Sequence, residues 1–256
     1  MIDISIIIPT YNNLGLLKKS LLSVINQQNV KIEIIIVDDS INSEINDYLK
    51  KINSDKIQYY RNIPSKGAVR NWNYGLTFAK GTYTTVLHHD EYYEDSINQL
   101  SNLLNNNKEE IEVIISKVKV IRSDNSSYSL YMNKHIKNFI LNNFPSVLFF
   151  YNFIGPVSCV IYKNSDEFFF NKNLKWFVDI DWYYRLFKNK KIKYFDNYNI
   201  ISILNHEGKI TYNIDIQTEM NNDYKYLFKE YIKFPMILLL IKLNFSYKKL
   251  KLKLLS

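Results

Sequence analysis

The first half of the chain alternates short apolar runs with segments whose apolar residues recur at helical spacing. Runs that are apolar at nearly every position, such as ISIIIP at 4–9, are typical of strands buried on both faces. The predicted strands lie at residues 4–9, 31–40, 56–62 and 82–87. The predicted helices lie between them, at residues 14–27, 45–52 and 67–81. This alternation predicts βαβ units, and therefore an α/β fold with a mostly parallel sheet flanked by helices.

The pattern changes after about residue 94, where helices and strands no longer alternate so regularly. Helices are predicted at residues 95–105, 135–152 and 179–189. Strands are predicted at residues 112–121 and 155–164, with one or two more within 191–205. We therefore expect one main domain whose second half is built differently from its first.

The last forty residues combine apolar residues with many lysines around Pro235 and predict a basic helical tail. The longest uncharged run, residues 234–241, is far shorter than the roughly 20 residues that a membrane-spanning helix needs. A basic, apolar helix is instead expected to lie on an anionic membrane surface.

The composition adds a charge argument. The chain has 256 residues and a formal net charge of +8, which suggests an anionic partner such as nucleic acid, an acidic membrane or a phosphorylated small molecule. The single cysteine, Cys159, excludes an intramolecular disulfide and fits a reducing compartment. The N-terminal sequence runs straight into a strand and lacks the pattern of a signal peptide, so we expect a cytoplasmic protein.

Polar residues follow three of the predicted strands, at 10–12, 38–40 and 88–91. Ligands of open α/β sheets bind outside the carboxyl ends of the strands. Asp38 and Asp39 are placed to bind a nucleotide base and ribose, although capping the following helix is an equally good account of them. No G-x-G-x-x-G motif follows the first strand, which argues against an NAD-dependent enzyme.

The sequence LHHDE at 87–91 ends the fourth predicted strand and offers ligands for a divalent cation. Carboxylates are ligands for Mg²⁺ and Mn²⁺, and histidine suits Mn²⁺ better. Taken alone, an acid and a histidine at a strand end more often satisfy backbone groups. Asp179 and Asp181 likewise fit either a general base or acids favoured by a helix N-terminus.

Basic residues and a histidine have two accounts as well. His206 is either a metal ligand or a turn residue before Gly208. Arg70, Lys66 and Lys209 are either contacts to a diphosphate or ordinary solvated side chains. The order of all these motifs along the chain is more informative than any one of them.

In that order, the chain contains SIIIPTYNN, IIIVDDS, NWNYGLTFAKGTYTTVLHHDE, NFIGPVSCVIYK, VDIDWYYRLF and NHEGKIT. These blocks resemble family 2 glycosyltransferases of the bacterial type, which have the GT-A fold. The resemblance covers roughly residues 3–213. It implies a glycosyltransferase domain at 1–213, with a nucleotide-sugar-binding half at 1–93 and an acceptor-side half at 94–213, followed by the basic helical tail at 214–256.

The resemblance also implies roles for individual residues. Asp179 is the implied catalytic base, Asp90 and His206 the implied metal ligands, and Lys209 and Thr211 the implied diphosphate contacts. The residues implied to bind the nucleotide-sugar are Thr10, Tyr11, Asn12, Asp38, Asp39, Arg70, Asn73, His88 and His89. The residues expected on the acceptor side are Gly155, Pro156, Trp176 and Asp181. The chain departs from the family pattern at His88, which replaces the first acid of D-x-D, and at Val178, which replaces a glutamate.

The expected reaction is therefore an inverting transfer of a sugar from a nucleotide diphosphate-sugar, with UDP as the expected nucleotide. The acceptor is expected to be a hydroxyl of a glycan or lipid-linked molecule in surface polysaccharide synthesis, such as lipopolysaccharide or capsule. The cofactor is expected to be Mn²⁺ or Mg²⁺, and the location the inner face of the cell membrane, with the tail on its anionic surface.

Three alternatives remain at this point. A catalytically inactive nucleotide-sugar-binding protein is motivated by His88 and Val178. A nucleotidyltransferase would use a related sheet, but its Gly- and Lys-rich phosphate loop is missing. An RNA-binding module would fit the charge, yet no RNA-binding motif is present, so we expect no nucleic-acid partner.

Overall fold

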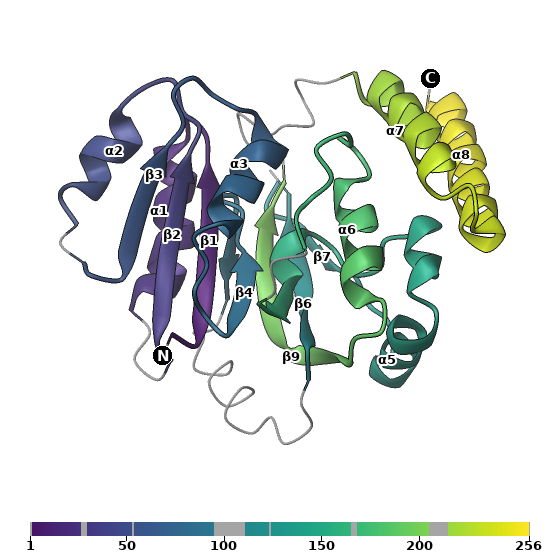
Figure 1. The fold of residues 1–256 in the computed structure, drawn as a ribbon, viewed down its shortest axis with the longest axis horizontal. Helices are drawn as coiled ribbons and strands as arrows, with labels where there is room; N and C mark the ends of the chain where they lie inside the picture. The colour runs from purple at the N-terminus through teal and green to yellow at the C-terminus, as the bar shows by residue number, and fades with distance from the viewer. Residues whose placement is uncertain are drawn as a thin grey trace.

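A mixed β-sheet runs through the centre of the molecule, with helices packed on both of its faces (Figure 1). The computed structural model describes residues 2–26, 30–52, 54–94, 111–122, 124–164, 168–204 and 215–255. In Figure 1, α3 and α6 cover the face nearest the viewer, and the hairpin of α7 and α8 lies at the right-hand edge. The helix predicted at 95–105 lies outside the described residues.

The described residues form nine strands in one sheet. The strands are β1 (Ile4–Thr10), β2 (Ile32–Asp38), β3 (Ile57–Arg61), β4 (Tyr83–Val86), β5 (Glu91–Tyr93), β6 (Val113–Ile121), β7 (Ser127–Ser129), β8 (Val160–Lys163) and β9 (Ile192–Ile203). Their order is β3-β2-β1-β4-β8-β6-β9-β5, and β7 pairs with β6. The first four strands are parallel, whereas β8 is antiparallel to both β4 and β6.

The predicted parallel sheet is therefore confirmed for the first half of the chain, and antiparallel neighbours enter in the second half. Both β1 and β2 are buried at all seven positions, as expected for strands covered on two faces. The two shortest strands, β5 and β7, were not predicted, because three residues are too few to show a period.

Three of the helices begin at a residue whose side chain caps them. The helices are α1 (Leu14–Ile25), α2 (Glu44–Leu49), α3 (Ala68–Leu76), α5 (Lys134–Asn143), α6 (Val178–Phe187), α7 (Ile216–Glu230) and α8 (Pro235–Leu255), with 3₁₀ turns η1 (Pro145–Phe149) and η2 (Val157–Cys159). The side chains of Asn13, Asn133 and Asp215 accept backbone N–H bonds at the starts of α1, α5 and α7. The helix predicted at 135–152 divides before Pro145, as expected from the restricted backbone of a residue that precedes proline.

Helix α3 ends at Leu76, not at Gly81 as predicted. The backbone N–H groups of Lys80 and Gly81 donate to the Ser5 hydroxyl at 3.1 and 2.7 Å, and Lys80 also donates to Glu33 at 2.7 Å. Ser5 in turn donates to Glu33 at 2.6 Å, and both side chains are buried. This buried polar pair draws the chain out of the helix and into β4.

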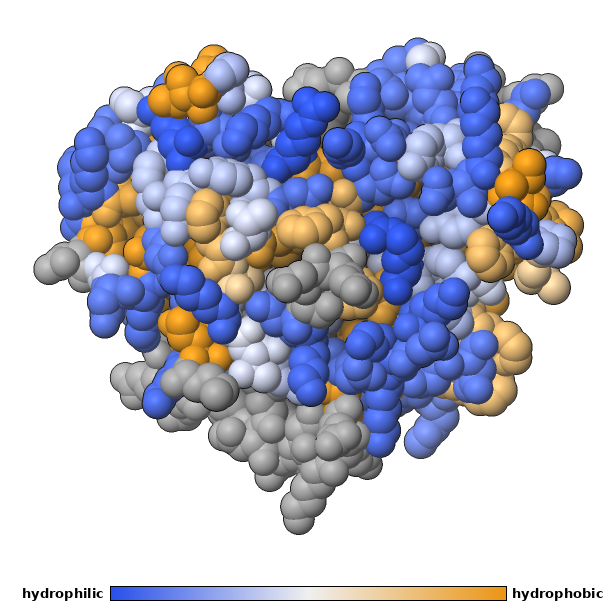
Figure 2. Space-filling model, viewed as in Figure 1, coloured by the Kyte–Doolittle hydropathy of each residue, from blue (hydrophilic) through white to orange (hydrophobic). Residues whose placement is uncertain are grey.

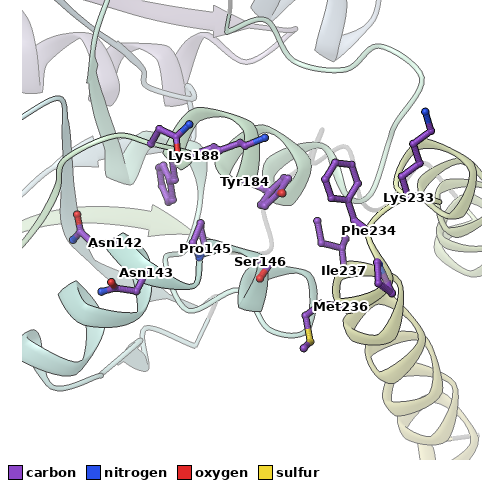
Figure 3. Close-up of a pocket in the computed structure, with 13 residues that line it drawn as sticks. Asn142, Asn143, Pro145, Ser146, Tyr184, Lys188, Lys233, Phe234, Met236 and Ile237 are labelled. Atoms are coloured by element: carbon purple, nitrogen blue, oxygen red, sulfur yellow. The ribbon is translucent and has the colours of Figure 1, made fainter.

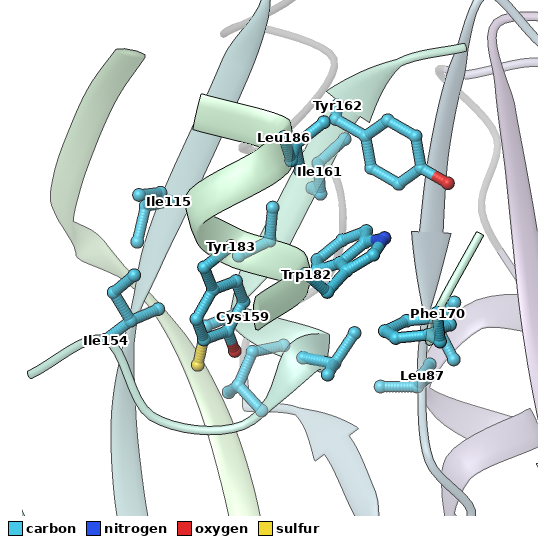
Figure 4. Packing of buried hydrophobic residues seen from close by; sticks show 14 of the residues in the cluster. Leu87, Ile115, Ile154, Cys159, Ile161, Tyr162, Phe170, Trp182, Tyr183 and Leu186 are labelled. Atoms are coloured by element: carbon cyan, nitrogen blue, oxygen red, sulfur yellow. The ribbon is translucent and has the colours of Figure 1, made fainter. Parts of the chain in front are cut away.

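Trp182 and Tyr183 of α6 are the two largest fully buried side chains, and they pack onto β8 and η2 (Figure 4). The ring of Trp182 stacks on Phe170 at 4.7 Å between centroids and meets Tyr162 edge-on at 5.3 Å. Helix α6 is therefore fixed to the sheet along its whole length, which matters because Asp179 lies in its first turn.

The two C-terminal helices pack against the rest of the domain. Asp223 of α7 accepts backbone N–H bonds from Lys175, Trp176 and Phe177, at the entrance to α6. Asn244 of α8 is buried, accepts from the Tyr224 hydroxyl at 2.6 Å and donates to the Phe150 carbonyl at 2.5 Å. The predicted helical tail is thus present, and its helices also complete the core. Within the described residues, no helix has the combination of length and hydrophobicity that crossing a bilayer requires.

We expect Gly81→Ala to lower the free energy of unfolding by about 1–3 kcal/mol, the usual cost of overpacking a well-packed site. A Cβ at Gly81 would lie 2.6 Å from the backbone nitrogen of Ser5 and 2.7 Å from the carbonyl carbon of Ile4. Gly15→Ala is the matched control, since a Cβ at Gly15 has no neighbour closer than 3.6 Å. Urea unfolding of the two variants measures the difference, and equal stability would contradict the packing argument.

Candidate active site

The loops after β1, β2 and β4 meet at one edge of the sheet. The backbone N–H of Asp39 donates to the Thr10 carbonyl at 3.0 Å, and that of Leu87 donates to Ile7 at 2.8 Å. The Nδ1 atom of His89 lies 3.2 Å from the Pro9 carbonyl. The sequence prediction that these three loops share an edge is confirmed by these contacts.

Asp39 accepts four hydrogen bonds from the segment that leads into α3. Its Oδ1 accepts from the Asn62 side chain at 3.0 Å and the Lys66 N–H at 2.8 Å, and its Oδ2 accepts from the Ser65 hydroxyl at 2.5 Å and the Gly67 N–H at 2.8 Å. A carboxylate offers about four acceptor positions. Asp39 thus holds the loop before α3 and does not cap the helix that follows Ser40, as the alternative account expected, and its binding of a base or ribose stays a prediction.

Asp38 is fully buried beside it. One carboxylate oxygen accepts from the Ser40 N–H at 2.9 Å, and the other accepts from the Tyr59 hydroxyl at 2.8 Å. Burial, followed by the bond to Asp38, raises the pKa of Tyr59, so this hydroxyl keeps its proton and remains a donor. Asp38 therefore fixes the end of β2 and the start of the loop that follows.

Residues 10–12 lie at the end of β1 and contact the loop that follows β2. Thr10 is buried, and among the described residues its hydroxyl has no hydrogen-bond partner. Tyr11 is 40% exposed, and Asn12 has a positive φ of 48°. The Asn12 N–H donates to Ser40 Oγ at 2.8 Å, and its side chain accepts from the Ile41 N–H at 3.1 Å. Tyr11 and Asn12 are thus the exposed members of this group, whereas the Thr10 hydroxyl is buried.

Helix α3 presents Arg70 and Trp72 near the same edge, and uses two asparagines for structure. Arg70 is exposed. The buried Asn71 donates to the Val37 carbonyl at 3.0 Å. The amide of Asn73 both donates to and accepts from the Phe170 backbone, at 2.8 Å each, which joins α3 to the second half of the domain. The predicted role of Asn73 in binding the nucleotide is not tested.

His88, Asp90 and Glu91 form a group of possible metal ligands after β4. One ligand atom from each residue lies within 4.8 Å of the others. Glu91 is buried, and its carboxylate accepts from the hydroxyls of Ser158 and, at 3.3 Å, Ser202. Burial raises the pKa of Glu91, and the adjacent negative charge of Asp90 adds to this effect. A divalent cation would relieve both effects, so the residues present fit such an ion.

Three contacts hold His88 in place, two at its ring and one at its backbone. Its Nδ1 lies 3.6 Å from Glu91, its backbone N–H donates to Ser158 at 3.1 Å, and its ring lies 4.6 Å from that of Trp72. Burial lowers the pKa of His88 to about 4, so the imidazole is neutral at neutral pH. Its Nε2 is buried and has no hydrogen-bond partner among the described side chains and backbone. A neutral imidazole with an unpartnered nitrogen is able to ligate a cation.

Asp179 lies close enough to this group to raise the pKa of Glu91 through its charge. It is partly buried in the first turn of α6, and this burial raises the pKa of Asp179 to about 7. A carboxylate with such a pKa is suited to proton transfer at neutral pH. The structure thus places Asp179 near Glu91, which follows Asp90 directly in the chain. The predicted role of Asp179 as the catalytic base stays a prediction.

The predicted acceptor-side residues divide into two groups. Gly155 adopts a positive φ of 109°, and its carbonyl accepts from the Tyr183 hydroxyl at 3.0 Å, so the loop containing Pro156 lies against α6. Trp176 is partly exposed at the entrance to α6. Asp181 is buried and bonded to Arg185 at 2.9 Å and Tyr231 at 2.7 Å, contacts that fix α6 to the end of α7. Its role toward an acceptor stays a prediction.

Some site residues were not predicted, and others cannot be placed. Ser158, Ser202 and Trp72 contact Glu91 or His88, yet no spacing in the sequence marks them. His206, Lys209 and Thr211 lie outside the described residues.

Asp39→Asn should lower the free energy of unfolding by about 2 kcal/mol even without any ligand, because hydrogen bonds to a charged group contribute about 1.5–3 kcal/mol each. The asparagine amide accepts only at its oxygen. Its NH2 group would face donors that it cannot bind. Asp196→Asn, at an exposed carboxylate, is the matched control. Unchanged stability of the Asp39 variant would show that this carboxylate does not hold the loop.

The sequence and the fold both match known glycosyltransferases. An uncharacterised glycosyltransferase of Rickettsia typhi is 26% identical over 237 residues, which are 90% of this chain and 71% of that one. An Escherichia coli protein, UDP-Glc:alpha-D-GlcNAc-diphosphoundecaprenol beta-1,3-glucosyltransferase WfaP, is 37% identical over 90 residues, which are 35% of this chain and 36% of that one. The match to WfaP thus spans only about a third of either protein.

Among solved structures, Staphylococcus aureus TarS (residues 1–349) in complex with UDP-GlcNAc has a TM-score of 0.65 at 16% identity. The match covers 88% of this chain and 65% of that one, and it supports the GT-A-like fold. The sequence model described as glycosyl transferase family 2 matches residues 5–158, more than half of the chain. This protein therefore belongs to glycosyl transferase family 2.

Proposed function

We propose that the protein transfers a sugar from a UDP-sugar to a hydroxyl of a lipid-linked glycan, with inversion at the anomeric carbon, during surface polysaccharide synthesis. The observation that carries this proposal is the group of His88, Asp90 and Glu91 after β4, with Asp179 near enough to act on Glu91 through its charge. The names of two relatives support the acceptor class. WfaP acts on a sugar-diphosphoundecaprenol, and a Campylobacter jejuni relative, 34% identical over 94 residues, is named as a glucosyltransferase acting on a diphosphate-undecaprenol glycan.

The residues that would hold a divalent cation are His88 and Asp90, with Glu91 behind them. Such a cation, Mn²⁺ or Mg²⁺, supplies Lewis-acid stabilisation of the negative charge on a leaving diphosphate. The nitrogen of His88 favours Mn²⁺, because Mg²⁺ strongly prefers oxygen ligands. Trp72 keeps the His88 ring fixed beside these acids.

Asp179 is the proposed general base. It takes a proton from the acceptor hydroxyl while that oxygen attacks the anomeric carbon, and the carbon–oxygen bond to the diphosphate breaks on the opposite side. Burial disfavours the ionised form of Asp179 and raises its pKa to about 7. This value lies near neutrality, where a base works best.

The acceptor is proposed to enter beside α6, between the Gly155–Pro156 loop and Trp176. The partly exposed ring of Trp176 offers an apolar surface on which a sugar face can pack. A lipid-linked acceptor lies in a membrane, and we propose that the basic C-terminal helices bring the enzyme to its inner face.

Binding of a nucleotide tests the proposed donor class. UDP with Mn²⁺ should raise the melting temperature, and EDTA should remove most of the increase, because a ligand that binds only the folded state stabilises it, by about 2.7 kcal/mol at a hundred times its Kd. Asp90→Asn should lose the metal-dependent part, while Asp196→Asn should behave as wild type. GDP, CDP and dTDP serve as comparison ligands. No shift with UDP, or an equal shift for all four, would contradict a UDP-sugar donor.

Turnover tests the proposed base. Asp179→Asn should reduce UDP release from UDP-glucose or UDP-GlcNAc, in the presence of a synthetic prenyl diphosphate-GlcNAc acceptor, by about 10²- to 10⁴-fold. Its melting-temperature shift with UDP should remain that of wild type. A wild-type rate for this variant would remove Asp179 from the mechanism.

The pH profile of the wild-type enzyme gives a second test of this base. A base is active when ionised, and the pKa of Asp179 is about 7, so kcat/KM should rise with pH and level off above about pH 7. A base with an ordinary aspartate pKa would instead give a flat profile over this range, which initial rates from about pH 5.5 to about pH 9 distinguish.

A further inference from the structure

Helix α8 buries one face and exposes the other. Ile237, Ile241 and Asn244 are at most 6% exposed and pack against the domain. Met236, Leu239, Leu243 and Tyr247 are between 47% and 63% exposed. Their spacing of three, four and four residues places these four side chains in one stripe along the helix. In Figure 2, apolar side chains gather at the right-hand edge of the molecule, over the α7–α8 hairpin.

A cavity of about 440 Å³ opens at the start of this stripe. Its apolar lining includes Tyr184, Phe187 and Pro145, with Phe234, Met236 and Ile237 from the beginning of α8. Figure 3 shows Phe234 and Ile237 facing Tyr184 and Ser146 across this space. The volume lies within the range of about 300–1,000 Å³ that is typical of small-molecule sites.

The apolar surface continues on the other side of the cavity. Phe144 is 53% exposed, and its two neighbours in the sequence, Asn143 and Pro145, both line the cavity. Phe139 is also exposed, and its ring lies 5.9 Å from that of Phe144. The cavity thus lies between two groups of exposed apolar side chains.

Every charged side chain of α8 is a lysine. The sequence of α8 contains no aspartate or glutamate, and Lys242 and Lys249 are exposed along one side of the stripe. Lys188 and Lys233 line the cavity itself. Apolar side chains beside lysines are the arrangement by which a helix lies in the interface of an anionic bilayer. A symmetric dimer through this face would instead bring the same lysines of two copies together, which like-charge repulsion disfavours.

We propose that this surface, the cavity and the α8 stripe together, docks on a bilayer of anionic phospholipid. A lipid phosphate lies against Lys188 and Lys233, and the stripe enters the acyl boundary. This inference extends the proposed function, which places the acceptor on a lipid, but it concerns a surface separate from Asp179 and Asp90. Deleting α8 would be a poor test, because the deletion also removes Ile241 and Asn244 from the core.

Flotation of the full-length chain with vesicles tests the proposal. The protein should float with vesicles containing phosphatidylglycerol and not with phosphatidylcholine alone. Leu243→Glu should abolish flotation, while Leu22→Glu, at an exposed leucine of α1, should float as wild type. Lys188→Gln with Lys233→Gln should weaken partitioning about five-fold for each lysine, since a lysine near an anionic surface contributes about 1 kcal/mol. Lys50→Gln with Lys51→Gln, directly after α2, changes the net charge equally and should have a smaller effect.

Four results would overturn the proposal. The first two are failure of the wild type to float with anionic vesicles and flotation of Leu243→Glu equal to that of Leu22→Glu. The third result concerns a protein that does not float. If inorganic phosphate raises its melting temperature, and the increase depends on Lys188 and Lys233, the cavity is a free-phosphate site. The fourth is a dimer, detected by light scattering, that Leu243→Glu dissociates. The UDP-dependent melting shift is recorded for every variant, so that failure of lipid binding is separated from failure of the proposed donor binding.

Discussion

The parallel pairing of β1 with β2 on one side and β4 on the other is the constraint on which the site depends. Parallel strands end at the same edge of a sheet, so residues 10–12, 38–40 and 88–91 come together although they are far apart in the chain. The pairing itself is stabilised by a buried polar contact, in which Ser5 and Glu33 accept the N–H groups of Lys80 and Gly81. The chain thereby returns to the sheet directly before β4.

The burial of titratable groups gives this edge its chemical character. Glu91 and Asp179 both have pKa values raised by desolvation, and the pKa of His88 is lowered by the same cause. The low polarity of their buried surroundings therefore favours the neutral form of all three residues. A site of this kind gains most from a ligand that brings positive charge, and a divalent cation between His88 and Asp90 would favour the ionised carboxylates. The burial that suits Asp179 to the proposed role of base is thus the same environment that would favour a metal.

Sequence reasoning predicted the strands of the first half because their burial on both faces leaves continuous apolar runs. The resemblance to the family selected Asp90 and Asp179, and their roles stay predictions. Sequence reasoning did not give β5, since Glu91 to Tyr93 pair with β9 more than a hundred residues later in the chain. It also did not separate the roles of adjacent acids. Asp39 takes four bonds from residues 62–67, a distribution that depends on the folded path of that loop.

Helix α6 connects the proposed active site to the proposed membrane-docking surface. Asp179 lies in its first turn, and Lys188 follows its last residue, Phe187, at the cavity beside α8. Nine residues separate these two positions, which corresponds to about 14 Å along a helix. Asp223 and Tyr231 of the C-terminal segment fix both the entrance of α6 and its buried Asp181. A surface that rests on lipid through α8 would therefore hold the proposed base at a fixed distance from the membrane, because these contacts join α6 directly to the C-terminal segment.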